Sequence, residues 1–372
     1  MTGSAPSEPD TSRREKSALT NVRVFDGRQL RAPGTVVIDG DRIGTDPVGA
    51  RVIDGGGAVL LPGLIDCHVH LSGAQDLRRL CEHGVTTALD MAAWPPAMVD
   101  SLRKVRGLTD IRSAGTLAIS AGGMHAKLGG IPEDSIVNGP ADAERFVAAR
   151  VAEGSDYIKI VAEHPDAEGL DQSTLNALVA AAHAHGKAVV AHAADYGAVA
   201  MAQQAGADVI THAPLDRALD TEAVALMVAD DRVAVPTLTM MEAVIERAGG
   251  GAGLDYAPAR ASVTALYQAG VPVLAGTDAN STPGSPAHVP HGTSLHRELE
   301  LLVDAGLTTV DALRAATELP AQHFGLADRG AIEPGLRADL VLIDGDPVAD
   351  IRATRRLRRI WCAGVEHAPA QG

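Results

Sequence analysis

The alternation of apolar and polar positions divides the chain into two kinds of region. Near the N-terminus, residues such as Val36 and Ile38 alternate with other positions as in a β-strand, and Asp-Gly turns separate the runs. The last segment, GAIEPGLRADLVLIDGDPVADI followed by RRIWCAGVEH, has the same character. Because two similar ends flank a different middle, we predict one small β-domain that is built from residues 19–60 plus 331–372.

The middle region, residues 61–330, alternates strand-like with helix-like segments. Eight nearly continuous apolar runs occur along it: LLPGLIDCHVH, VTTALDMAA, IRSAGTLAIS, YIKIVA, AVVAHA, DVITHA, VAVPTLT and VPVLAGTDA. Such runs are expected of parallel strands that are covered on both faces. Eight β/α units in this length predict an α/β fold of the TIM-barrel type, (β/α)8. A doubly wound open sheet is the alternative, but no GxGxxG or Walker motif supports nucleotide binding there.

Composition narrows the choice of partners. The formal net charge of −15 argues against nucleic acid and anionic membranes, which both need basic patches. Cys67, Cys81 and Cys362 are widely separated, so neither a disulfide framework nor a CxxC zinc motif can be built from them. We predict that the polar residues 1–18 form a disordered tail, and they contain no signal-like apolar core. No apolar run has the length of a membrane span, so we expect a cytoplasmic protein that acts on a small molecule.

Polar residues end five of the predicted strands, at the edge of a TIM barrel where catalysis takes place. Taken singly, a histidine at a strand end is usually a hydrogen-bonded structural group. A lysine inside YIKIVA is harder to explain, because a buried, unpaired ammonium is costly unless its pKa falls. Alternate residues of a strand share a face, so the two histidines of HVH point the same way and can bind one ion. Six such residues at the ends of five strands are hard to explain by chance, so we expect His68, His70, Lys159, His192, His212 and Asp278 to form one functional site.

Several stretches of the chain together match one enzyme family. They are LLPGLIDCHVHL, HGVTTALDM, DYIKI, VVAHA, GADVITHA, AGTDA, HGTSLHRELELLVDAGLTTVDALRAAT and RGAIEPGLRADLVLIDGDP. On these stretches the chain resembles the amidohydrolase superfamily over nearly its whole length. It looks closest to the imidazolonepropionase-like and Xaa-Pro dipeptidase-like branch. The resemblance implies that the terminal β-domain is a small β-sandwich, and that barrels can pair into a homo-oligomer.

The resemblance also implies two divalent ions and a role for each ligand. By position, the more buried ion would be bound by His68, His70 and Asp278, and the more exposed ion by His192 and His212. Lys159 would be carboxylated, and its carbamate would bridge the ions. Zinc suits imidazole and carboxylate ligands, although manganese, iron or cobalt can replace it. Asp278 would act as general base toward a water whose pKa the ions lower, and would then protonate the leaving group.

The loops after the barrel strands are expected to shape the substrate pocket. Related dipeptidase-like sequences tend to have GGH after the third strand, where this chain has GGMH. His125 is therefore a candidate to contact the substrate carbonyl or oxyanion, with loop structure as the alternative. The other candidates for substrate contact are Tyr196, Thr239 and His291. For Tyr196 we favour the start of the following helix, and we expect a structural role for His296.

Two further groups of pocket candidates rest on position alone. Thr237 and Met240 of the seventh-strand stretch PTLTMMEAV can line the pocket, but core packing explains the methionine equally well. Lys127 and Arg217 are candidates to meet a substrate carboxylate. A solvated surface position is the expectation favoured for both.

The leading hypothesis is a metal-dependent amidohydrolase that cleaves an amide-type C–N bond of an N-acyl amino acid, a proline-type dipeptide or a cyclic amide. The first alternative is a mononuclear deaminase, or an imidazolonepropionase-like hydrolase of a cyclic amide or amidine. Deaminases typically have a glutamate three residues after the fifth-strand histidine, where this chain has Asp195. Esterase or phosphotriesterase activity needs no different ligands. A non-catalytic scaffold would be expected to have lost ligands, and none is missing.

Overall fold

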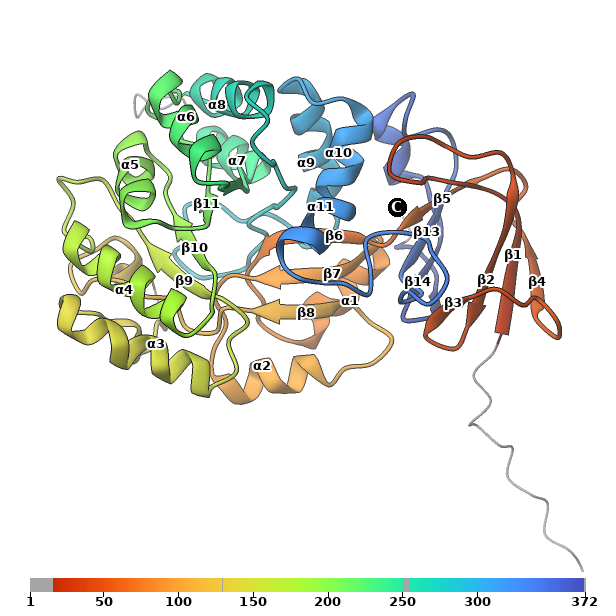
Figure 1. Ribbon diagram of the computed structural model, residues 1–372, viewed down its shortest axis with the longest axis horizontal. Helices are drawn as coiled ribbons and strands as arrows, with labels where there is room; N and C mark the ends of the chain where they lie inside the picture. The colour runs from red at the N-terminus through yellow and green to blue at the C-terminus, as the bar shows by residue number, and fades with distance from the viewer. Residues whose placement is uncertain (1–15, 129, 250–254, 371–372) are drawn as a thin grey trace, which may run out of the picture.

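The chain folds into a terminal β-domain and a larger α/β domain, which lie side by side (Figure 1). The structure is a computed structural model, and it describes residues 16–128, 130–249 and 255–370. Among these residues, no helix is both long enough and apolar enough to cross a membrane.

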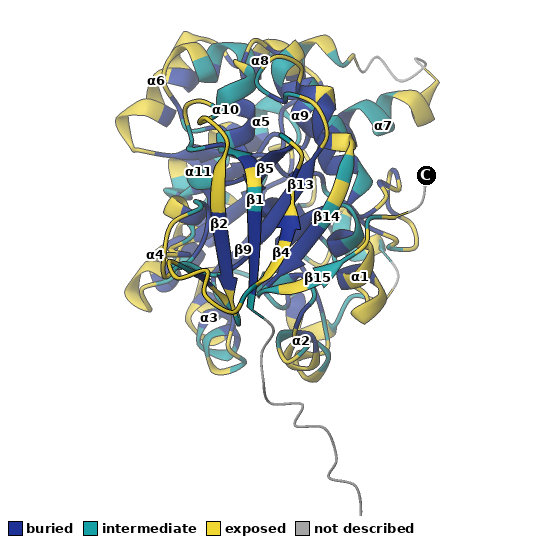
Figure 2. Ribbon diagram, turned by 90° about the vertical axis from the view of Figure 1, so that its right-hand side faces the viewer, coloured by how far each residue is buried: buried dark blue, intermediate teal, exposed yellow. Residues whose placement is uncertain are grey.

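Both ends of the chain contribute strands to the terminal domain. Its strands are β1 (Lys16–Val24), β2 (Gly34–Asp39), β3 (Arg42–Gly44), β4 (Arg51–Asp54), β5 (Val59–Pro62), β13 (Leu340–Ile343), β14 (Leu357–Cys362) and β15 (Val365–His367). They hydrogen-bond in the order β15-β14-β13-β5-β1-β2-β3, and β4 pairs with β1. Strand β13 is buried along its whole length, and β1 is buried mainly in its first half, as Figure 2 shows. The N-terminal and C-terminal strands of this domain are joined by the pairing of β13 with β5.

The predicted N-terminal tail is too long by three residues. Strand β1 already begins at Lys16, and both Ser17 and Ala18 are buried. The strand extends to this point because residues 16–19 pair with β2 and residues 17–20 pair with β4, so their backbone groups are satisfied within a sheet. The rest of the predicted tail, residues 1–15, lies outside the described residues.

Parallel strands form the centre of the larger domain. They are β6 (Leu64–Val69), β7 (Val85–Asp90), β8 (Asp110–Ser113), β9 (Ile158–Val161), β10 (Val189–His192), β11 (Val209–Thr211) and β12 (Val233–Ala234). They make one sheet, β6-β7-β8, and a second sheet, β12-β11-β10-β9. Isolated parallel bridges connect these sheets: Ala118 to Ile160, Ala234 to Val273, and Val69 to Ala279. The eighth predicted strand is present only as the segment 271–279 that carries two of these bridges. The TIM-barrel architecture with its separate β-sandwich domain is confirmed.

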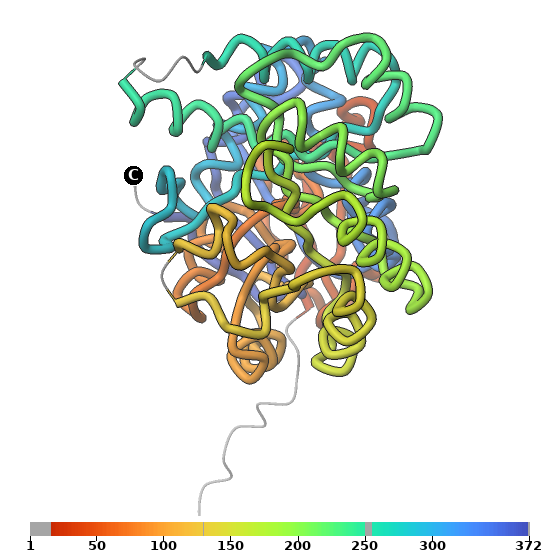
Figure 3. Tube along the Cα trace, turned by 90° about the vertical axis from the view of Figure 1, so that its left-hand side faces the viewer, coloured from red at the N-terminus to blue at the C-terminus, as the bar shows by residue number. Residues whose placement is uncertain are grey.

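Helices cover the outside of the barrel, as the view from the side away from the terminal domain shows (Figure 3). They are α1 (Ala74–Glu82), α2 (Pro96–Arg103), α3 (Ala143–Ala152), α4 (Gln172–Ala184), α5 (Tyr196–Ala205), α6 (Thr221–Ala229), α7 (Leu238–Ala248), α8 (Ala257–Gln268), α9 (Thr293–Asp304), α10 (Thr309–Ala315) and α11 (Glu318–His323). Three consecutive helices start at an aspartate whose carboxylate accepts a backbone N–H of the first turn: Asp171 before α4, Asp195 before α5 and Asp220 before α6.

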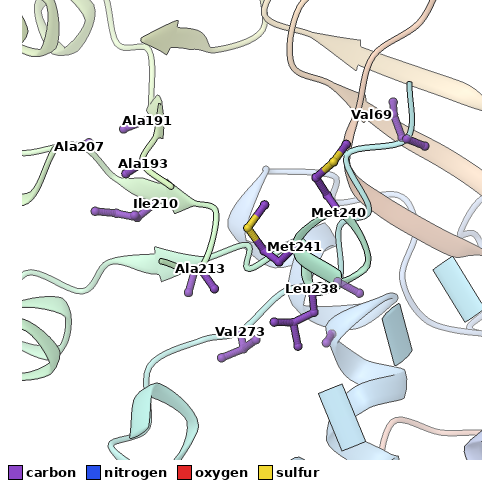
Figure 4. Close-up of a cluster of buried hydrophobic side chains, with 14 of the residues drawn as sticks. Val69, Ala191, Ala193, Ala207, Ile210, Ala213, Leu238, Met240, Met241 and Val273 are labelled. Carbon is purple, nitrogen blue, oxygen red and sulfur yellow. The ribbon is translucent and has the colours of Figure 1, made fainter. Parts of the chain in front are cut away.

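The inner face of α7 belongs to the barrel core. Leu238, Met240 and Met241 lie close to apolar residues of the strands and of their ends in Figure 4. Met240 is only 2% exposed, so it packs in the core. The structure thus decides between the two positions that the sequence left open for this methionine.

Candidate metal centre

The six predicted ligands come from the ends of five barrel strands. His68 lies in β6, and His70 is the first residue after that strand. Lys159 lies in β9, and His192 ends β10. The register places His192 opposite Thr211, the last residue of β11, and His212 comes next. Asp278 lies in the segment 271–279, and its backbone N–H donates to the carbonyl of His68 at 2.8 Å. Parallel strands therefore bring side chains that are distant in sequence to one edge of the barrel.

Three of these residues form a compact group around one carboxylate. Oδ1 of Asp278 is 2.9 Å from Nε2 of His70 and 3.4 Å from Nε2 of His68. One ligand atom from each of the three lies within 4.8 Å of the other two. Two imidazoles and one carboxylate at this spacing are a typical donor set for a divalent transition metal.

The second histidine pair adjoins this group. Nε2 of His212 is 2.9 Å from Nδ1 of His192, and their ring centroids are 4.6 Å apart. The His212 ring also lies 4.9 Å from the His68 ring, and its Nδ1 is 3.9 Å from Oδ2 of Asp278. The five side chains are thus one continuous cluster, centred on His68, His212 and Asp278.

Hydroxyl groups orient two of the histidine rings. Nδ1 of His68 is 2.9 Å from Oγ1 of Thr211, and Nδ1 of His212 is 2.6 Å from Oγ1 of Thr237. For His68, this contact leaves Nε2 directed into the cluster. Histidines that bind metals usually have the second ring nitrogen fixed in this way.

Two buried polar atoms of the cluster have no hydrogen-bond partner among the described residues. They are Nε2 of His68 and Nζ of Lys159, and the two residues are 1% and 2% exposed. Burial lowers the pKa of Lys159 to about 7, and the charge of Asp278 opposes this shift only in part. Unsatisfied buried donors and acceptors are costly, so the site fits a bound group that these two atoms would contact.

The local electrostatics hold most side chains of the cluster in the protonation states that bind a cation. Burial lowers the pKa of His68 and His192 well below the usual range, and that of His212 to about 3, so these rings are neutral at pH 7. Burial opposes ionisation of Asp278, but the hydrogen bond and charge of His70 lower its pKa overall. Neutral imidazoles and an ionised carboxylate are the forms that bind metal ions.

His125 lies against the second histidine pair. Its ring centroid is 4.5 Å from that of His192, in an edge-on arrangement. The carboxylate of Glu163 fixes the ring: Oε1 is 3.1 Å from Nδ1 of His125, and it accepts the backbone N–H groups of Met124 and His125. The one-residue shift in GGMH therefore does not remove this histidine from the site.

The other predicted substrate contacts have partners elsewhere. The hydroxyl and the backbone N–H of Thr239 both donate to the buried carboxylate of Glu298, at 2.7 Å each. Nε2 of His291 is 3.0 Å from the carbonyl oxygen of His70, so it contacts the ligand backbone. Tyr196 begins α5, as favoured, and its hydroxyl donates to Asp220 at 2.7 Å while Arg217 stacks on its ring at 3.5 Å. The structure thus brings only His125 of these four side chains against the ligand cluster.

Comparisons with known proteins decide the family. The model of the amidohydrolase family matches residues 59–366. The chain belongs to the amidohydrolase family. A relative, an uncharacterized protein of Mycobacterium tuberculosis strain H37Rv, is 30% identical over 336 residues that cover 84% of this chain and 85% of that protein. The imidazolonepropionase of Deinococcus deserti is 28% identical, over 92% of each chain.

The solved structures agree with the fold of this amidohydrolase. A crystal structure of a Xaa-Pro dipeptidase with bound methionine in the active site superposes with a TM-score of 0.81, at 23% identity, over 95% of this chain and all of the other. The predicted superfamily and branch are thereby confirmed. Family membership supports a hydrolase that acts on C–N bonds, and the family generally uses divalent metal.

Two carboxylates of the site were not found from the sequence. Asp66 is fully buried and accepts both the hydroxyl and the backbone N–H of Thr277, which ties β6 to the residue before Asp278. Glu163 holds His125, as described above. Asp66 lies two residues before His68 in the pattern DCHVH, and Glu163 lies four residues after Lys159 in the pattern KIVAE. The period of two along a strand is the signal that can indicate them.

Proposed function

We propose that this amidohydrolase hydrolyses an amide-type C–N bond of a small molecule with the help of two divalent ions, zinc being the expected metal. The observation that carries the proposal is the single cluster of His68, His70, Asp278, His192 and His212, with Lys159 buried beside it. His68, His70 and Asp278 would hold one ion, and His192 and His212 the other. A carboxylated Lys159 would offer both ions an anionic oxygen. This change would remove the cost of an unpaired ammonium at that position.

The chemistry divides between the ions and the side chains. When bound, the ions supply a water of low pKa and polarise the scissile carbonyl. The Asp278 carboxylate, ionised at neutral pH, accepts the proton of the attacking water and returns it to the leaving nitrogen. His125 would stabilise the developing oxyanion as an imidazolium, whose Nδ1–H donates to Glu163 while its Nε2–H donates to the substrate oxygen.

One contact favours hydrolysis of an amide over the deaminase alternative. Asp195 occupies the position where deaminases typically have a glutamate, and its Oδ1 accepts the backbone N–H of Ala198 at 2.8 Å. The carboxylate caps α5, so it is engaged in holding the helix. We propose an N-acyl amino acid, a proline-type dipeptide or a cyclic amide as the substrate. Hydrolysis of an ester or phosphotriester on the same ligands is the second candidate.

The first test is the effect of Lys159→Ala on metal content and hydrolysis. Because the proposed carbamate holds both ions, we expect the variant to lose at least one of two metal equivalents per chain and most of its activity. Metal analysis of the purified protein and rates on a panel of N-acyl amino acids, dipeptides, cyclic amides, lactones and amino-heterocycles provide the measurement. Lys187→Ala is the matched control, since its Nζ donates only to a backbone carbonyl outside the cluster.

Two results would contradict the proposal. One metal equivalent in the unmodified chain, together with turnover of an amino-heterocycle, would favour the mononuclear deaminase. Full activity and full metal content in Lys159→Ala would contradict the proposal that a carbamate on Lys159 bridges the two ions.

A further inference from the structure

A second cluster of metal-binding side chains lies where the terminal domain meets the first helix of the barrel. Cys81 on α1 and Cys362 at the end of β14 are both 0% exposed, and their Sγ atoms are 3.1 Å apart. A ring nitrogen of His367 on β15 lies within 4.8 Å of both sulfur atoms. These residues take no part in the cluster around Asp278.

Regular secondary structure brings the three side chains together. Strands β14 and β15 are joined by the two-residue turn Ala363-Gly364, in which both residues have positive φ, 48° and 77°, as in the turns that favour tight hairpins. Cys362 pairs with Val365, and His367 lies two residues further along. Cys362 and His367 therefore share one face of the hairpin, and α1 presents Cys81 to this face.

We propose that Cys81, Cys362 and His367 bind one Zn²⁺ ion that joins the terminal domain to the barrel. Two thiolates and an imidazole are a typical donor set for zinc. When the ion binds, the two thiols release their protons to solvent, and the two thiolate charges balance the charge of Zn²⁺. The buried site stays neutral, which avoids the cost of an isolated charge. His367 is partly exposed, so we expect the ion, and a water as fourth ligand, to reach the site from this side.

The hydrogen bond of His367 supports its role as a ligand. Its Nε2 is bonded to the backbone carbonyl of Gly107. A carbonyl oxygen only accepts, so Nε2 carries the proton and Nδ1 of the neutral ring keeps its lone pair. Metal-binding histidines typically donate their second N–H to a carbonyl or carboxylate in this way.

The sulfur separation lies between two possible states of the cysteine pair. Two thiolates on tetrahedral zinc, with Zn–S of about 2.3 Å, are about 3.8 Å apart, whereas a disulfide brings the atoms to about 2.05 Å. The observed 3.1 Å requires a movement of less than about 1 Å for zinc. The imidazole decides in favour of the metal, because a disulfide needs no third ligand.

Cobalt spectroscopy on the full-length chain tests this site separately from the active site. Metal-free protein is titrated with Co²⁺, and the near-ultraviolet thiolate-to-cobalt charge-transfer band is recorded. The Asp278 cluster contains no cysteine, so the band reports on Cys81 and Cys362. We expect the band in the unmodified chain and in the His68→Ala/His70→Ala double variant, and its loss in Cys362→Ser.

Zinc analysis and two further variants make the test decisive. The unmodified chain should hold one zinc equivalent more than Cys362→Ser, and Cys67→Ala, which removes the third thiol, should keep the charge-transfer band. His367→Gln, at a half-exposed position, serves if Cys362→Ser does not fold, and it should weaken Zn²⁺ binding roughly 10-fold or more. Absence of the band, equal zinc content, or a Cys81–Cys362 disulfide found by mass spectrometry in protein purified without reductant would overturn the proposal.

Discussion

At the scale of single residues, the carboxylate of Glu163 decides where the His125 ring lies. It accepts two backbone N–H groups and faces the ring nitrogen Nδ1, although burial opposes its charge. The net effect of these contacts is a pKa below the usual range, so the group is ionised at neutral pH. A carboxylate that contacts both the ring nitrogen and the adjacent backbone N–H groups is expected to act on catalysis through the position of the ring.

We therefore expect Glu163→Gln to lower kcat/KM by about 100-fold, because the amide turns an N–H₂ group toward N–H donors and the ring shifts. Metal content should not change, since Glu163 is not a proposed ligand. The measurement is steady-state kinetics together with metal analysis. Glu168→Gln, an exposed carboxylate of the same loop, is the control and should keep full activity; loss of metal in Glu163→Gln would contradict a positioning role.

At the scale of elements, His296 joins three segments of the barrel surface. It lies on α9, its Nε2 is 3.0 Å from the carbonyl oxygen of His83 after α1, and its Nδ1 is 3.1 Å from the hydroxyl of Thr354. The side chain is buried, and burial lowers its pKa to about 4. The structural role expected from its helical position is confirmed by these contacts.

This histidine should make part of the stability depend on pH. Because the folded-state pKa lies below the unfolded value, the unfolded chain binds the proton first as pH falls. The contribution is present above pH 6.5 and is lost between pH 6.5 and 4, by roughly 3 kcal/mol in the free energy of unfolding. Denaturant unfolding at several pH values should therefore show a shallower acid decline for His296→Gln. Equal slopes for variant and parent would contradict the prediction.

At the scale of the whole molecule, Arg329 connects the barrel to the terminal domain. Its side chain is 4% exposed, and its guanidinium donates to the hydroxyl of Thr87 and the carboxylate of Asp110, both at 2.8 Å. It also lies 4.0 Å from the carboxylate of Asp339, just before β13. One buried cation thus balances acids of both domains.

Replacement of this cation should destabilise the protein strongly. Arg329→Met removes the charged hydrogen bonds to Thr87 and Asp110, while Arg112 and Arg337 still pair with Asp110 and Asp339, so we expect a loss of about 2–3 kcal/mol in the free energy of unfolding. Urea unfolding followed by circular dichroism measures it. Arg352→Met is the control, because Arg352 forms an exposed ion pair with Asp350 and should cost less than about 1 kcal/mol. Similar losses for the two variants would show that Arg329 does not join the domains.

Much of this architecture was predictable because its signals are local. Apolar runs of strand length locate the barrel strands, and polar residues at their ends locate His68, His192 and Asp278. The eighth strand was predicted as well as the others, yet it forms only isolated bridges. A hydrophobic pattern reports burial, while strand assignment also requires continuous pairing with neighbours.

The sequence by itself predicted the fold class and the polar strand ends, since period and spacing are properties of neighbouring positions, and the resemblance of several stretches to a known family supplied the family and the ligand roles. Only the tertiary structure decided the contacts between distant positions. It directed the hydroxyl of Thr239 to Glu298, placed Glu163 against His125, and brought the sulfur of Cys81 to that of Cys362. No periodic pattern encodes such pairs, because they depend on how strands and helices pack after they have formed.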